Sequence, residues 1–288
     1  MNNEIKKLAP KQFPKLLREI SDPPKQLFLK GVLPSDDMKF LCVVGSRKYS
    51  PYGKEVCEKL ISGLKGYKIV IVSGLALGID AIAHTAALDA GLKTIAIPGS
   101  GLGDKALYPN TNKNLAKRIL ENGGALISEF DENFKATIYS FPQRNRIMAG
   151  ISHAVLIIEA EEKSGTLITS RLATEYNRDV LTVPSSIFSA TSYGPHMLLR
   201  LGATPITKSN DILEALGFNF KDDNSRQNIL FENLSEKEKK IVEILKIPMS
   251  RDELIARLSL PIQEINVILS AMEIKGIIKE RMGEIRIS

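Results

Sequence analysis

Short apolar segments recur along residues 40–217, and polar or amphipathic stretches separate them. The apolar segments are rich in Val and Ile and do not alternate with polar residues, which is typical of strands buried on both faces. Strands are therefore predicted at 40–45, 68–72, 94–98, 125–128, 154–159 and 180–183. Helices are predicted between them, near 52–65, 78–90, 111–122, 143–150 and 166–178.

The alternation of strands and helices predicts the class of this domain. Strand–helix–strand units place strands parallel, and right-handed crossovers put helices on both faces of the sheet. We therefore expect an α/β fold in which residues 40–217 form a Rossmann-like domain with a doubly wound, mainly parallel sheet. Residues 1–39 are expected to lead in with one short helix and one extended segment that packs on this sheet.

A second, smaller domain is predicted after the polar linker at 218–233. Residues 234–288 are predicted to form three helices and a short β-wing, which is the pattern of a winged-helix domain. From 232 to 288, ten Lys and Arg balance ten Asp and Glu, so the whole formal charge of +6 lies upstream. Because a helix that enters a groove lined with phosphates is normally basic, protein contact or a structural role is favoured for this domain over DNA contact by the wing.

The composition narrows the class of protein further. The sequence has no long apolar run and no signal peptide, which favours a cytoplasmic protein without membrane contact. Cys42 and Cys57 are the only cysteines, and the three histidines are scattered, so neither a disulfide framework nor a metal or cofactor site is expected. The positive net charge fits a polyanionic partner.

The candidate chemistry begins where the first predicted strand ends, at Gly45, Ser46, Arg47 and Lys48. Open α/β sheets bind ligands at the carboxyl ends of their strands. An arginine beside free backbone N–H groups favours an anion, most simply a phosphate. The alternative is a structural turn with a solvated arginine.

Later strand exits carry similar chemistry. After the second strand, Gly74 and Gly78 leave room for a ligand near the backbone. Arg144 and Arg146 flank Asn145 at a predicted helix start, where the helix dipole favours anions. After the fifth strand, Lys163 precedes backbone amides and hydroxyl groups that could bind a phosphate. The alternatives are a paired or solvated arginine and plain helix capping by Ser164 or Thr166. These exits add the candidates Gly74, Gly78, Arg144, Asn145, Arg146, Lys163, Ser164, Gly165 and Thr166.

Asp80 and His84 lie four residues apart and share a predicted helix face. They could form an acid–base dyad, or the aspartate could simply hold the histidine in place. The second interpretation is favoured because no nucleophile accompanies the pair.

Taken together, these motifs resemble the DNA processing protein A family, DprA or Smf, over nearly the whole chain. The resemblance implies a core that binds single-stranded DNA without base specificity, loads RecA recombinase in natural transformation, forms a homodimer and performs no catalysis. It also implies that Arg47 binds a backbone phosphate, with Gly45 and Ser46 shaping its turn, and that Arg144, Asn145, Arg146 and residues 163–166 are parts of the same pocket. It rests on residues 44–47, 73–80 with Ala83 and His84, Tyr108-Pro109 with Asn112, Phe141-Pro142 with 144–147, and 164–169.

One departure from the family pattern concerns the third strand exit. Some relatives have a basic residue after Tyr-Pro, where this chain has Asn110, and Lys105 or Lys113 could supply that charge instead. Stacking on bases could come from aromatic side chains, although most of these are expected in the core: Tyr49, Tyr52, Tyr108 and Phe141.

The alternative function is an enzyme of the lysine-decarboxylase-like group, which cleaves nucleoside monophosphates. Its pattern is Pro-Gly-Gly-x-Gly-Thr-x-x-Glu. Alignment on Gly165-Thr166 puts residues 161–163, Glu-Glu-Lys, in place of Pro-Gly-Gly, and Thr169 in place of the glutamate. Both the phosphate cradle and the catalytic carboxylate are therefore missing, which favours DNA binding.

Overall fold

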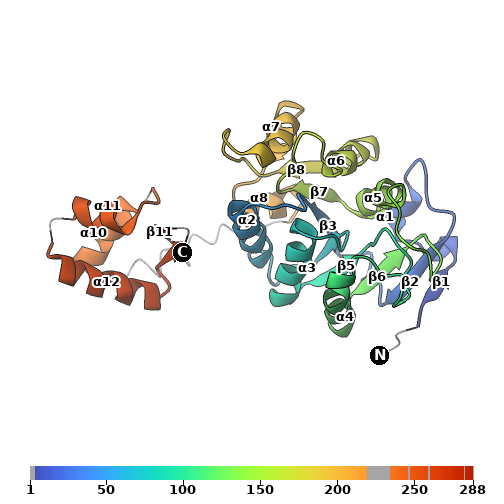
Figure 1. Ribbon diagram of the computed structural model, residues 1–288, viewed down its shortest axis with the longest axis horizontal. Helices are drawn as coiled ribbons and strands as arrows, with labels where there is room; N and C mark the ends of the chain where they lie inside the picture. Colours follow the sequence, from blue (N-terminus) through green and yellow to red (C-terminus); the bar gives the residue numbers. More distant parts are fainter. Residues whose placement is uncertain (1–3, 219–233, 246, 259, 282, 288) are drawn as a thin grey trace. The chain divides into compact units, whose positions relative to one another are not determined.

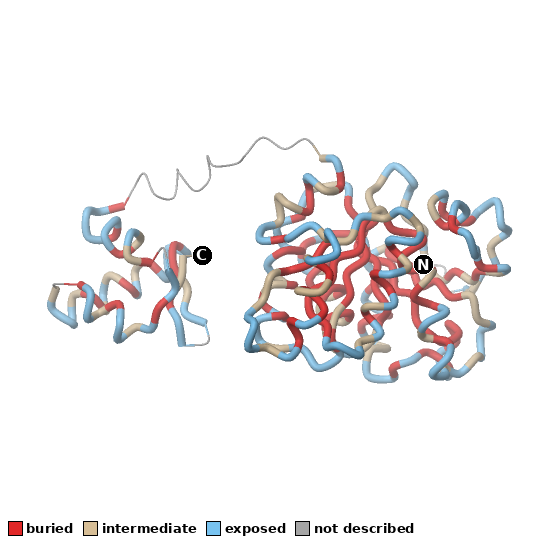
Figure 2. The backbone as a smooth tube through the Cα atoms, turned by 90° about the horizontal axis from the view of Figure 1, so that it is seen from above, coloured by how far each residue is buried: buried red, intermediate tan, exposed pale blue. Residues whose placement is uncertain are grey.

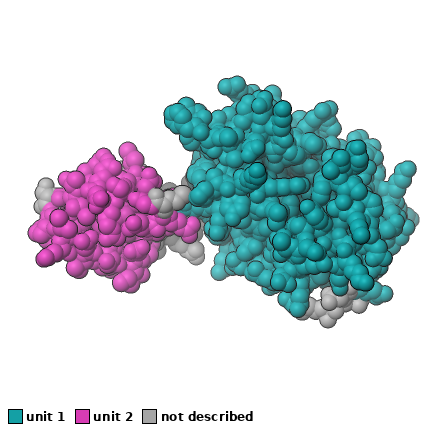
Figure 3. All heavy atoms as spheres, viewed as in Figure 1, with its two compact units in different colours: residues 1–219 teal, residues 220–288 magenta. Residues whose placement is uncertain are grey.

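The computed structural model describes residues 4–218, 234–245, 247–258, 260–281 and 283–287. The chain divides into two compact units, Met1–Asn219 and Phe220–Ser288 (Figure 3). Apart from Phe218, the predicted linker lies outside the described residues. Within the described residues, every helix is too short or too polar to cross a membrane.

The first unit is built on a nine-stranded sheet that is parallel from β6 to β9. The α/β class and the mainly parallel sheet are thus confirmed. The chain order of the parallel strands reverses between β3 and β7, and this switch point is where such sheets hold ligands. In spatial order the strands are β1 (Lys6–Leu8), β2 (Leu27–Gly31), β6 (Ala125–Ser128), β5 (Lys93–Ala96), β4 (Ile69–Ser73), β3 (Lys39–Val44), β7 (Ala154–Ile157), β8 (Asp179–Thr182) and β9 (Thr204–Pro205).

Helices cover both faces of this sheet (Figure 1). On one face lie α2 (Pro51–Ser62), α3 (Ile79–Asp89) and α4 (Lys113–Glu121), with α8 (Ser209–Ala215) beside α2. On the other lie α1 (Lys15–Arg18), α5 (Ser140–Ile151), α6 (Thr166–Glu175) and α7 (Tyr193–Arg200). Three 3-10 turns occupy Pro10–Gln12, Asn110–Asn112 and Ala190–Ser192.

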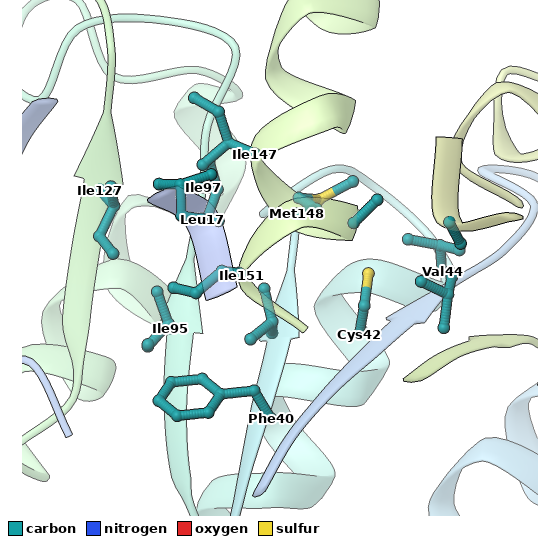
Figure 4. Close-up of a cluster of buried hydrophobic side chains, with 14 of the residues drawn as sticks. Leu17, Phe40, Cys42, Val44, Ile95, Ile97, Ile127, Ile147, Met148 and Ile151 are labelled. Carbon is teal, nitrogen blue, oxygen red and sulfur yellow. The ribbon is translucent and has the colours of Figure 1, made fainter. Parts of the chain in front are cut away.

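The central strand β3 is buried on both faces, as its continuous apolar sequence predicts. Figure 2 shows the buried residues of the first unit gathered at its centre. The alternate residues Phe40, Cys42 and Val44 of β3 lie in one core cluster with Ile147 and Met148 of α5 (Figure 4). This packing fixes α5 against the strand whose exit carries the candidate phosphate loop.

The lead-in is part of the sheet. Strand β2 pairs antiparallel with β6, so that Phe28 lies opposite Ser128. Leu17 and Ile20 pack against Gly150 of α5, where a Cβ atom would lie only 3.0 Å from Leu17 Cδ1. The start of the chain therefore closes one edge of the sheet and covers the helix that lies over β3.

The second unit contains α10 (Glu236–Ile244), α11 (Arg251–Arg257), α12 (Ile262–Ile274) and the hairpin β10 (Ile278–Arg281) with β11 (Glu284–Ile287). It has its own apolar core, which includes Ile241, Leu254, Ile265 and Leu269. The three helices and the wing confirm the predicted winged-helix domain. Ser235 and Glu238 cap α10 reciprocally, as the capping-box sequence predicts.

Candidate nucleic-acid interface

A pocket of about 550 Å³ lies at the carboxyl ends of β3 and β7. The loop after β3, the start of α5 and the loop before α6 line it, because the switch point brings these segments together. Nine of the thirteen candidate residues line this pocket: Gly45, Ser46, Arg47, Lys48, Arg144, Asn145, Ser164, Gly165 and Thr166.

The loop after β3 is held in one shape by its own hydrogen bonds. Ser46 Oγ accepts from the Lys48 N–H at 3.0 Å and donates to the Lys48 carbonyl oxygen at 2.8 Å. Arg47 and Lys48 are exposed at the tip. The Arg47 guanidinium lies over the Phe141 ring, 5.1 Å from its centroid, which orients a cation toward the pocket.

Gly74 and Gly78 lie at positions where other segments of the chain approach the backbone closely. Gly78 has φ of +82°, and a Cβ atom there would lie 2.3 Å from the Ser46 carbonyl oxygen. A Cβ at Gly74 would lie 2.0 Å from Arg144 Nη1. Protein groups fill the space beside Gly78, so the prediction that it leaves room for a ligand is wrong. Gly74 lies against Arg144 but also lines a small recess next to the pocket.

Arg144 is buried, with 4% of its surface exposed, beneath the pocket. Its Nη1 donates to the carbonyl oxygens of Gly74 and Ile97, and its Nε donates to Asn145 Oδ1 at 3.1 Å. Asp80 accepts from the Gly74 N–H at 3.0 Å; burial raises the pKa of its carboxyl group, and the Arg144 charge opposes that rise. Arg144 therefore joins the exits of β4 and β5. It lies in the second turn of α5 and not at its start, which corrects the predicted position.

Arg146 points to other partners. Its Nη2 pairs with Glu129, and its Nη1 donates to the Asp22 carbonyl oxygen at 2.8 Å. Arg146 thus ties the lead-in to the exit of β6. For Arg146, the alternative interpretation from the sequence is therefore the right one: the arginine pairs with a carboxylate, that of Glu129.

The loop before α6 is joined to the pocket from the other side. Thr166 Oγ1 donates to the Gly45 carbonyl oxygen at 3.2 Å, and Asn145 Nδ2 donates to the Gly165 carbonyl oxygen at 3.3 Å. The N-cap position of α6 is Gly165, and Ser164 Oγ accepts from the Thr166 N–H in the first turn at 3.2 Å, so Ser164 supplies the side-chain bond that the capping alternative predicted. Lys163 lines a neighbouring hollow formed with α7.

The predicted relation between Asp80 and His84 is also wrong. His84 Nδ1 lies 2.7 Å from Thr94 Oγ1, while Asp80 bonds to the backbone of Gly74. Burial lowers the pKa of His84 to about 3, so its ring is neutral near pH 7. The histidine is a core residue held by a threonine of β5.

Two features of the site were missed from the sequence. Tyr49, Tyr52 and Tyr108 are exposed, whereas most of the aromatic side chains were expected in the core. Glu159 is fully buried and accepts from the Ser50 N–H at 2.9 Å and from Thr191 Oγ1 at 2.8 Å. Glu159 follows directly after an apolar strand in the sequence, and this position could have predicted its bonds to Ser50 and Thr191, because a buried carboxylate needs several hydrogen-bond donors.

The fold and the pocket define a class of protein: a Rossmann-like unit with a basic pocket at the switch point of its sheet, followed by a winged-helix unit. The described residues contain no group of three or more His, Cys, Asp or Glu that could hold a metal ion. Residues 5–217 match the family described as DNA recombination-mediator protein A, and residues 232–284 match the DprA winged helix domain. The chain therefore belongs to the DprA/Smf family of DNA recombination-mediator proteins, as its motifs predict.

Known relatives agree with this assignment. The chain is 41% identical over 206 residues to protein Smf of Escherichia coli, which covers 72% of this chain and 54% of that protein. It is 44% identical over 208 residues to DNA processing protein DprA of Streptococcus pneumoniae, covering 72% of each. The chain thus spans about half the length of the E. coli relative.

Two solved structures share the fold. The crystal structure of S. pneumoniae DprA matches with a TM-score of 0.68 and 39% identity, over 76% of each chain. The Helicobacter pylori DprA structure matches with a TM-score of 0.66 and 30% identity, over 75% of this chain and 98% of that one. The H. pylori work concerns a single-stranded DNA binding mode of that protein.

Proposed function

We propose that this protein binds single-stranded DNA without sequence preference and loads RecA recombinase onto the strand in natural transformation. The observation that carries the proposal is the pocket at the switch point. It offers two exposed cations, Arg47 and Lys48, together with the Thr166 side chain and the backbone around Gly165. Phosphate contacts of this kind hold a strand and carry no base information. The single-stranded DNA binding described for the H. pylori relative supports this function.

The RecA step and the cellular setting are part of the same proposal. The family description as a recombination mediator supports the RecA step. We place the protein in the cytoplasm, with Cys42 and Cys57 as buried free thiols. A direct test measures RecA assembly on a single strand with and without this protein; unchanged assembly would contradict the loading step.

Catalysis is not part of this proposal. Thr169 lines the pocket at the position where the lysine-decarboxylase-like pattern requires its glutamate. Two carboxylates line the pocket: Asp80, which is next to Arg144 and bonded to Gly74, and Glu161, which is exposed in the loop before α6. Neither stands at the position of the patterned glutamate, which is Thr169, and this disfavours the enzyme alternative.

The function is tested by the affinity for a mixed-sequence single strand and for its duplex across a salt series. We expect the single strand to bind more tightly, with little dependence on sequence and with an affinity that falls as salt rises. Preference for the duplex, or absence of binding at low salt, would contradict the proposal.

We expect deletion of residues 232–288 to leave most of the affinity for the strand. The α12 helix exposes Ile262, Val267 and Ile274, whereas phosphate binding needs Lys or Arg. The expected loss is less than about tenfold, or roughly 1.4 kcal/mol. Anisotropy titration of the folded truncation measures it, with circular dichroism as the control for folding. A collapse of affinity would assign DNA contacts to the winged-helix domain.

We also propose a homodimer, and the structure offers a surface for it around α7. Ile187, Phe188, Tyr193 and Leu201 are exposed there, and this group is called the α7 surface. Helix α6 is a second possible surface, and it exposes Ile168 as its large hydrophobic residue. Ile187 and Tyr193 line the same hollow, and exposed apolar side chains that lie together mark an interaction site more often than isolated ones do.

Phe188→Glu is expected to convert the dimer to a monomer. The Phe188 side chain is 93% exposed in the single chain, and dimerisation through the α7 surface would bury the new carboxylate, which is costly. Light scattering measures the mass of each variant. Val32→Glu, which changes an exposed apolar residue after β2, is the matched control and should leave the mass unchanged. A monomeric wild type would refute the dimer itself.

A further inference from the structure

A smaller recess adjoins the pocket described above. Arg47 and Phe141 line both hollows and so form the wall between them. The far side of the recess is made by Leu77, Tyr108 and Pro109, from the exits of β4 and β5. Single-stranded DNA with a phosphate bound to Arg47 would therefore lie directly beside this recess.

Three planar groups lie in a row along the recess, from Arg47 through Phe141 to Tyr108. The Arg47 guanidinium lies 5.1 Å from the Phe141 centroid, and the Tyr108 ring lies 5.8 Å from Phe141 and is tilted to it by 51°. A Cβ atom at Gly99 would lie 2.6 Å from Phe141 Cδ1, so the Phe141 ring is held between Gly99 and Arg47. Tyr108 is 48% exposed, so its ring is open to a ligand.

The backbone around Tyr108 is fixed before any ligand binds. The Tyr108 N–H donates to Ser100 Oγ at 3.1 Å. Asn112 Nδ2 donates to the carbonyl oxygens of Leu75 at 2.8 Å and Ala76 at 3.1 Å, which joins this loop to the exit of β4. A fixed platform binds with a smaller loss of conformational entropy than a mobile one.

We propose that Tyr108 is a base-stacking platform, on which the nucleobase next to the phosphate held by Arg47 lies, with Leu77 at its edge. This inference rests on the proposed binding of single-stranded DNA and specifies how a base is held. An aromatic face accepts any base, because every base has a π-face. The base must be unpaired to reach the ring, so this subsite excludes duplex DNA. It does not distinguish one base from another.

The first test compares Tyr108→Leu with Tyr108→Phe on two oligonucleotides of equal length, oligo-thymidylate and its abasic counterpart. Tyr108→Leu should weaken oligo-thymidylate binding roughly 5- to 100-fold, the range for one stacked base. Tyr108→Phe keeps the ring and should retain most of the affinity. The abasic oligonucleotide has the same phosphates and no bases, so Tyr108→Leu should leave its affinity unchanged.

The chain contains no tryptophan, which allows a second test. Tyr108→Trp creates a single fluorescent reporter that oligo-thymidylate should quench and the abasic oligonucleotide should not. Tyr67→Trp is the control reporter, because Tyr67 precedes β4 at the end of that strand opposite to the recess and packs edge-on against Phe218. Neither oligonucleotide should quench it.

The outcomes separate this subsite from the function on which it rests. Equal losses on both oligonucleotides, or no loss on either, would overturn the stacking role of Tyr108 while strand binding by the wild type stands. If the wild type binds neither oligonucleotide, the proposed function fails and the subsite fails with it.

Discussion

Replacing Arg47 with alanine is expected to weaken the binding of single-stranded DNA by roughly 1.5–3 kcal/mol, which is about 10- to 150-fold. Arg47 is exposed at the tip of the loop after β3, and its guanidinium is oriented by the Phe141 ring. The substitution removes a charge-assisted hydrogen bond to phosphate without emptying any part of the core.

Anisotropy titration of a labelled oligonucleotide across a salt series measures this effect. The slope of log affinity against log salt should become shallower by about 0.7 for each phosphate that the variant no longer neutralises. Arg18→Ala is the matched control, since Arg18 is an exposed arginine of α1. Equal affinities for Arg47→Ala and wild type would remove Arg47 from the site.

Replacing Arg144 with methionine should lower the free energy of unfolding of the first unit by about 3–5 kcal/mol. The substitution leaves the carbonyl oxygens of Gly74 and Ile97 without their donor and removes the cation beside buried Asp80. The loss is large because a buried carboxylate without a counter-charge is costly.

Urea unfolding of residues 1–231, followed by circular dichroism, measures that loss. Arg171→Met is the control: Arg171 is 82% exposed in its pair with Glu175, so its removal should cost at most about 1 kcal/mol. Adding Asp80→Asn to Arg144→Met should recover part of the stability. A loss below about 1 kcal/mol for Arg144→Met would show that the buried pair is not a stabilising link.

Sequence reasoning predicted the sheet because the central parallel strands β3, β4 and β7 are continuous apolar runs. It also predicted most of the pocket, since Gly45–Lys48 and Ser164–Thr166 follow strands that neighbour each other at the switch point. Exits of parallel strands meet at one edge of a sheet, so a set of candidates drawn from strand exits alone can be mostly right.

The directions of individual side chains could not be predicted in this way. Arg144 and Arg146 are two residues apart on α5, so they point to nearly opposite sides of the helix. Only the packed structure shows that Arg144 faces inward and Arg146 faces the lead-in. The start of α5 was placed too late because Pro142 suggests a helix boundary, although proline is tolerated in a first turn.

The pairing of β2 with β6 has a consequence for how the protein is made. Phe28 leaves the ribosome about a hundred residues before its partner Ser128, a gap of roughly 5–20 seconds at ordinary rates of synthesis. During that interval β1 and β2 have only each other, because the edge that they complete does not yet exist. Strands β1 and β2 are thus synthesised before the rest of the sheet but are among the last of its strands to pair with it.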